Sequence, residues 1–162
     1  MEHGTAPGWA LALEASGLGE AMRHSTWLYP TANLLHLLGL VLLVGSMVVL
    51  DLRLVGVAAA VPLVALSRFL TPMAAGGLVL LLASGFALFA ADAGPLAGNT
   101  LLQVKWALIA LGIVNALLFR RLWGERLAGW DARAPAVGRM QALLSLAVWL
   151  AVATAGRLIA YY

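Results

Sequence analysis

Four long apolar runs dominate the pattern of hydrophobic and polar positions, and short polar segments separate them. The runs cover about residues 27–50, 73–91, 101–119 and 141–160. An α-helix rises 1.5 Å per residue, so roughly 20 apolar residues cross the hydrocarbon core of a bilayer, which is about 30 Å thick. Each run meets this length. The pattern therefore predicts four membrane-spanning helices.

Consecutive spans run antiparallel, and the simplest packing of four such helices is a bundle. The composition favours the same class, because 63% of the residues are hydrophobic and 10% are charged, whereas a soluble domain carries about a quarter charged residues. The spans leave few of the 162 residues for anything else. We expect an all-α integral membrane four-helix bundle in which residues 1–162 form a single membrane domain.

Two segments outside the runs predict short helices at the membrane surface. Residues 9–23, WALALEASGLGEAMR, mix apolar side chains with glutamates, as interfacial helices do; a solvated amphipathic leader is the alternative. Residues 55–72 contain Pro62 and Pro72, and each proline is suited to the first turn of a helix. We therefore expect interfacial helices at the N-terminus and between spans one and two.

The basic residues predict how the bundle is oriented. Seven of the ten lie on the side reached after spans one and three: Arg53, Arg68, Arg120, Arg121, Arg126, Arg133 and Arg139. Basic residues collect on the cytoplasmic side of membrane proteins, so both chain termini are expected to be extracytoplasmic. The first long apolar run begins only at Trp27, which does not fit a cleaved signal peptide. The prediction is a multi-pass protein of the bacterial inner (plasma) membrane, in contact with the lipid bilayer.

The absence of cysteine narrows the chemistry. Without cysteine the chain has no disulfide, no thiolate metal site and no covalent CxxCH haem attachment. The sequence pI near 10 does not indicate nucleic-acid binding, because the arginines lie beside apolar spans and form no basic stripe with interleaved aromatic residues.

One histidine interrupts the first span. An α-helix turns 100° per residue, which places His36 on a stripe along one face of the helix whose polar residues lie toward its outer end. His36 itself lies about 12 Å below the outer boundary of the membrane. Such a stripe should face protein, because lipid cannot satisfy polar side chains. Gly39 and Gly45 would let another group approach the same helix. The members of the stripe are Tyr29, Asn33, His36, Leu40, Leu43 and Met47.

His36 has three interpretations. It could ligate haem iron, since neutral imidazole is the commonest metal ligand and a bundle core is a usual cofactor site. It could donate a hydrogen bond to another helix, or it could relay protons. A zinc or copper site built from protein alone is not expected, because His3 and His24 lie outside the spans.

Two cations near the outer ends of later spans are candidates for the same site. Lys105 shares a face of span three with Asn115, and Arg157 lies about one turn from the end of span four. Either cation could instead extend to the headgroups, and Arg157 could pair with an anionic group held between helices. Asn115 is expected to form an interhelical hydrogen bond. The inward stripe of span four should be Ser145, Trp149, Val152 and Gly156.

At the inner end of span one, the sequence DLRL places Asp51 two residues before Arg53. This spacing suggests an interfacial charge pair between the two side chains. Such a pair would mark topology, since exposed ion pairs contribute little to stability.

Three stretches resemble a known superfamily of small membrane proteins. They are LHLLGLVLLVGSMVVLDLRLVG in span one, GFALFAADAG at the end of span two and LLQVKWALIALGIVNALLF in span three. Together they resemble the HemJ-type protoporphyrinogen oxidases and are similar to CopD-like membrane domains. With the leader EASGLGEAMRHSTWLYPTANLLH, the chain is most similar to an uncharacterised bacterial four-helix family. The resemblance covers about residues 13–120.

The resemblance implies a first-span histidine that binds b-type haem and a lysine that works in the same site. In this sequence these are His36 and Lys105. HemJ-like proteins show a further histidine in the helix that carries the lysine, where this chain has Asn115 and no histidine. This departure counts against protoporphyrinogen oxidation, although a haem-dependent membrane oxidoreductase stays among the alternatives.

These inferences lead to one functional hypothesis and one rival. The first is a protein that binds haem b and transfers electrons between a quinol or porphyrin and a redox partner protein. The rival is a non-enzymatic transporter or accessory subunit whose intramembrane polar residues are structural, and a transporter of this length is expected to form a homodimer. The candidate cofactor-binding residues are His36 as the haem-iron ligand, Lys105, Arg157, Asn33 and Gly39.

Overall fold

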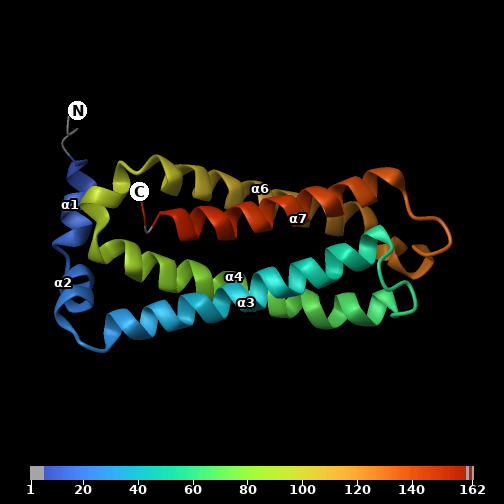
Figure 1. The fold of residues 1–162 in the computed structure, drawn as a ribbon, viewed down its shortest axis with the longest axis horizontal. Helices are drawn as coiled ribbons and strands as arrows, with labels where there is room; N and C mark the ends of the chain where they lie inside the picture. Colours follow the sequence, from blue (N-terminus) through green and yellow to red (C-terminus); the bar gives the residue numbers. More distant parts are fainter. Residues whose placement is uncertain (1–5, 160, 162) are drawn as a thin grey trace.

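The computed structural model describes residues 6–159 and residue 161, and these residues form helices joined by short turns (Figure 1). Four helices are long enough and apolar enough to cross a membrane, which confirms the predicted fold class. No strand occurs among the described residues. The elements in order are α1 (Gly8–Glu14), α2 (Gly17–His24), α3 (Leu28–Val55), α4 (Leu63–Ala91), α5 (Ala93–Ala97), α6 (Thr100–Trp123), the 3₁₀ helix η1 (Gly124–Gly129) and α7 (Ala136–Leu158).

The long helices form two antiparallel hairpins whose backbones approach each other most closely between α3 and α7. Helix α3 packs against α4, α6 packs against α7, and α3 packs against α7. Within the described chain, α4 and α6 make no close backbone contact. Figure 1 shows the hairpins side by side, with α1, α2 and α5 at one end and η1 at the other. We call these the α1 end and the η1 end.

Glycines allow α3 and α4 to lie very close together. A Cβ added at Gly39 would lie 3.0 Å from the carbonyl oxygen of Gly77, and one added at Gly77 would lie 2.6 Å from the backbone nitrogen of Leu43. Small residues at such contacts let the backbones of membrane helices approach. The α3–α4 hairpin is consequently the tightest part of the bundle.

The N-terminal segment forms two helices that cross the α1 end, where one interfacial helix was expected. Ser16 caps the start of α2 and separates it from α1. Glu14 accepts a hydrogen bond from the backbone nitrogen of Gly94 at 2.7 Å, and Arg23 donates one to the carbonyl oxygen of Ala91 at 3.0 Å. These bonds attach the leader to the end of α4 and the start of α5.

The expected interfacial helix between spans one and two is not a separate element. Residues 63–72 form the first turns of α4, which begins directly after Pro62 and continues through Pro72. Proline inside a helix removes a backbone donor, but membrane helices tolerate this loss when side-chain hydroxyls and neighbouring helices compensate. Ser67 and Thr71, whose hydroxyls lie 3.4 Å apart, sit in the turn before Pro72.

The expected pair between Asp51 and Arg53 does not form. Arg53 instead binds Asp131, with Nη1 to Oδ1 at 2.9 Å and Nη2 to Oδ2 at 2.7 Å. Residues two apart on a helix point about 200° away from each other, so both cannot face the same neighbour. Asp51 is buried on another side of α3.

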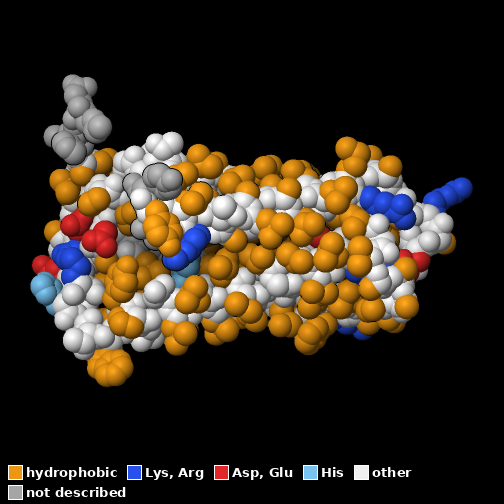
Figure 2. Space-filling model, in the orientation of Figure 1, with side chains coloured by type: hydrophobic (Ala, Val, Ile, Leu, Met, Phe, Trp, Pro, Cys, Tyr) orange, Lys and Arg blue, Asp and Glu red, His pale blue; other side chains and the backbone are white. Residues whose placement is uncertain are grey.

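Apolar side chains cover most of the bundle's sides, and charged side chains gather mainly near its two ends (Figure 2). Exposed residues along the long helices include Leu34, Val41, Val79 and Leu117. Large exposed apolar surfaces are rare on soluble monomers. The distribution agrees with a multi-pass membrane protein.

Candidate functional site

His36 lies on the side of α3 that faces α4. The side chain is half-buried, and its Nδ1 atom lies 3.0 Å from Oγ of Ser84 on α4. Gly85, the next residue of α4, leaves space for the ring, because a Cβ there would lie 3.1 Å from Cε1 of His36. The imidazole is therefore turned toward a neighbouring helix, as expected for a polar group that lipid cannot satisfy.

The hydrogen bond that Ser84 makes to Leu80 determines the direction of the bond between His36 and Ser84. The Ser84 hydroxyl has one hydrogen, and its Oγ lies 2.6 Å from the carbonyl oxygen of Leu80, to which it donates. A serine hydroxyl has one donor and two acceptor sites, so Ser84 accepts from Nδ1–H of His36. The ring then carries its proton on Nδ1. Its Nε2 atom keeps a free lone pair.

Lys105 approaches the same region from α6. Its half-buried side chain lies along α7, where a Cβ added at Gly156 would be 3.2 Å from Nζ. The ammonium lies within electrostatic reach of the His36 ring, although α3 and α6 are not neighbouring helices in the bundle. His36 and Lys105 thus interact electrostatically across the bundle without a hydrogen bond between them in the described chain, and a shared site stays a prediction.

The other three candidates lie elsewhere. Arg157 is exposed and donates to the hydroxyl of Tyr161, with its guanidinium 4.9 Å from the centre of that ring. Asn33 is exposed and forms no side-chain hydrogen bond within the described residues. Gly39 is buried against α4, so the space beside it is filled by that helix.

Two residues that complete the site had not been singled out from the sequence. Ser84 and Gly85 stand together in span two, within the stretch LASGFA. A serine beside a glycine in an apolar run is a weak signal, because both residues are common at ordinary helix contacts. Gly156, in contrast, belongs to the predicted inward stripe of α7, and its role in seating Lys105 follows from that placement.

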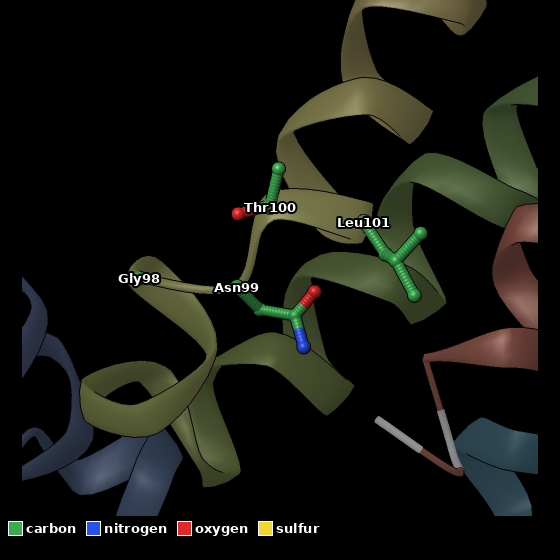
Figure 3. A pocket seen from close by; sticks show the side chains of 4 residues that line it. All are labelled: Gly98, Asn99, Thr100 and Leu101. Atoms are coloured by element: carbon green, nitrogen blue, oxygen red, sulfur yellow. The ribbon is translucent and has the colours of Figure 1, made fainter. Parts of the chain in front are cut away.

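Two open surface pockets lie away from His36. One, of about 490 Å³, is lined by Arg126, Gly129, Arg133 and Pro135 at the η1 end. The other, of about 330 Å³, lies at the start of α6 (Figure 3). There Asn99 caps the helix by accepting a hydrogen bond from the backbone nitrogen of Leu102 at 3.0 Å.

The described residues contain no group of three or more His, Asp or Glu side chains that could hold a metal ion on their own. What the site offers is one imidazole nitrogen with a free lone pair and one ammonium group on a different hairpin. This set can supply a single nitrogen ligand to a metal that brings its own further ligands. It can also bind a negatively charged group through Lys105.

Comparison with known proteins gives one match. A family model described as "Family of unknown function (DUF6644)" matches residues 9–162. No curated protein and no solved structure matches the chain. The match supports the expected similarity to an uncharacterised membrane family. It gives no support to the resemblance to HemJ-type oxidases or CopD-like domains.

Proposed function

The chain belongs to this family of unknown function, and we propose that it is a membrane protein that binds haem b through His36 and takes part in electron transfer. The observation that carries the proposal is the hydrogen bond from Nδ1–H of His36 to Ser84, whose own hydrogen is already donated to Leu80. Histidines that ligate metals commonly donate their other ring N–H in this way, which fixes the tautomer and the ring orientation.

The residues around His36 fit an iron ligand for three reasons. Nε2 has a free lone pair, Gly85 gives the ring space, and the ring lies between helices. A neutral histidine in this tautomer also avoids burying a charge, which would be costly inside a membrane. The porphyrin of haem supplies four nitrogen ligands to the iron, so one protein histidine can be enough to hold it, and the absence of further histidines from the described spans does not exclude this group.

Lys105 is proposed as the second binding residue. Its ammonium, seated beside Gly156, would attract a haem propionate, because lysine binds anionic groups as a point charge. The alternative, that a neutral Lys105 ligates the iron, requires burial to remove its proton. Arg157 is exposed and bound to Tyr161, so any contribution from it would come from the membrane surface.

Haem would supply a one-electron redox centre, and the protein would supply ligation and electrostatics. His36 would hold the iron from the α3–α4 hairpin, and Lys105 would bind the anionic edge of the group from the α6–α7 hairpin. The orientation predicted from the arginines puts both residues nearer the extracytoplasmic side. A quinol, a porphyrin or a redox partner protein on that side is the proposed exchange partner.

The test is an absorption spectrum of protein produced with added haem and purified in detergent. The wild type should show a Soret band, and His36→Ala should lose it. His24→Ala is the matched control, because His24 is exposed at the end of α2 and its loss should leave the band unchanged. A His36→Ala variant that folds and keeps the wild-type spectrum would refute the proposal.

A second candidate is a membrane component in which the polar residues serve only to join helices. Two hydrogen bonds favour it: His36 to Ser84 between α3 and α4, and Asn115 to the carbonyl oxygen of Gln141 at 3.1 Å between α6 and α7. The bond from Asn115 was expected from the sequence. On this alternative, His36→Ala would lower the thermal midpoint and no preparation would bind haem.

A further inference from the structure

A second polar group is buried in the bundle, at the contact between α3 and α7. Asp51 on α3 and Ser145 on α7 are both 3% exposed. Oδ2 of Asp51 and Oγ of Ser145 each lack a hydrogen-bond partner in the described part of the chain. Of the polar side chains around the Asp51 carboxyl, the Ser145 hydroxyl is the one placed to interact with it by hydrogen bonding. Two helices that pack together thus each bury a side-chain oxygen with unused hydrogen-bonding capacity.

No cation in residues 6–159 forms an ion pair with the Asp51 carboxyl. Arg53, two residues further along α3, binds Asp131 and also donates to the carbonyl oxygens of Val61 at 2.7 Å and Ala59 at 3.0 Å. The charged residues on the packed helices at this end are Arg68 on α4 and Arg139 on α7, and both are exposed. Neither forms an ion pair among the described residues.

The protonation state follows from this setting. An ionised carboxylate is only an acceptor, whereas a protonated carboxyl also has an O–H donor. Burying an unpaired charge is far more costly than burying a neutral group that is hydrogen-bonded. A single proton on Oδ2 of Asp51 removes the charge, and its donation to Oγ of Ser145 gives both oxygens a partner.

We propose that Asp51 and Ser145 form a proton-binding site inside the bundle, in which Asp51 is a carboxylic acid at neutral pH. The step is a simple protonation: a carboxylate and one proton from water give a carboxylic acid that donates to Ser145. The site is separate from His36, which lies 15 residues earlier on α3 and therefore about 22 Å away along the helix. It does not depend on haem binding.

The test is infrared spectroscopy of the protein in phosphatidylcholine vesicles, with aspartate labelled by ¹³C at the side-chain carboxyl. The sequence contains three aspartates, Asp51, Asp92 and Asp131. At pH 7 the wild type should show one labelled carbonyl band of a protonated acid. Asp51→Asn should abolish this band, whereas Asp92→Asn and Asp131→Asn should retain it.

A second variant keeps the test informative if Asp51→Asn does not fold. Ser145→Ala should retain the carbonyl band but shift its frequency, because the hydrogen bond to the hydroxyl is lost. A wild-type spectrum with only carboxylate bands at pH 7 would overturn the proposal, as would a band that persists in Asp51→Asn. A band that disappears when sodium chloride replaces choline chloride would also overturn it, since this result indicates a metal-cation site.

Discussion

Arg53 and Asp131 form a two-bonded ion pair across 78 residues of sequence. Arg53 is buried near the end of α3, whereas the Asp131 side chain is 58% exposed in the loop after η1. The guanidinium also binds two backbone carbonyl oxygens of the α3–α4 turn. One side chain therefore ties together the α3–α4 turn and the loop that leads into α7.

The ion pair should make stability depend on pH at the acidic end. The hydrogen bond from Arg53 lowers the pKa of Asp131 below its ordinary value, so this pair stabilises the fold above the unfolded pKa of about 3.9. That contribution is lost as the pH falls through the lowered pKa. Thermal midpoints of the wild type in detergent should therefore fall as the pH is lowered from about 5 to 2.

Asp131→Asn should have a lower midpoint at pH 7 and a smaller loss on acidification. Glu125→Gln is the control, because Glu125 is exposed in η1 and forms no ion pair in the described chain. Equal pH profiles for Asp131→Asn and the wild type would show that the pair does not contribute.

Close contact between α3 and α4 should make Gly77 intolerant of a side chain. A Cβ at Gly77 would lie 2.6 Å from a backbone nitrogen of α3, and overpacking of this kind costs about 1–3 kcal/mol. Gly77→Ala should lower the free energy of unfolding by that amount. Gly45→Ala is the matched control, because nothing lies within 4 Å of its added Cβ. Chemical denaturation in detergent measures both, and equal effects would contradict the prediction.

Removing the hydroxyl that orients His36 should weaken haem binding if the proposed function holds. Ser84→Ala should reduce haem affinity about 10- to 100-fold, the usual cost of losing a group that orients a metal ligand. The measurement is a titration of apoprotein with haem. Thr154→Ala is the control, since Thr154 donates to the carbonyl oxygen of Leu150 in its own helix and is exposed. Unchanged affinity in Ser84→Ala would show that the hydrogen bond to His36 does not contribute to haem binding.

The predicted orientation can be tested by single-cysteine labelling, because the natural chain contains no cysteine. Glu20 at the α1 end and Ala132 at the η1 end are both exposed. In intact cells, a membrane-impermeant thiol reagent should label Glu20→Cys and not Ala132→Cys. Both should react after the cells are permeabilised. The opposite labelling pattern would place the chain termini in the cytoplasm.

The spans and the inward face of α7 could be predicted because they depend on local pattern, whereas the predicted inward stripe of α3 is wrong at its outer end, where Tyr29 and Asn33 are exposed. Apolar length gave the four membrane helices, and helical periodicity gave the buried stripe of α7, including Ser145 and Trp149. The bond from Asn115 was expected for the same reason, since a polar side chain inside a bundle needs a partner. Each of these features is encoded within one helix.

The features that were missed depend on which distant segments meet. Nothing near Arg53 indicates that its partner is Asp131, because the loop after η1 comes close only when the two hairpins have assembled. The continuity of α4 through Pro72 was also missed. Proline is common in the first turn of a helix and usually breaks a helix elsewhere, so its presence at position 72 indicated a helix boundary. Ser84 was overlooked because its role is defined by a histidine 48 residues earlier.

The α3–α4 hairpin and the α6–α7 hairpin pack together chiefly between α3 and α7, with side-chain contacts such as Phe89 on α4 against Trp106 on α6. The His36–Ser84 bond lies wholly within the first hairpin, and the contact between Lys105 and Gly156 lies wholly within the second. A chain cut in the turn after α5 would thus yield two pieces that each carry half of the candidate site. Reassembly of the pieces would return the imidazole and the ammonium to the same region. Ligand binding at the candidate site would therefore report whether the two pieces have docked correctly.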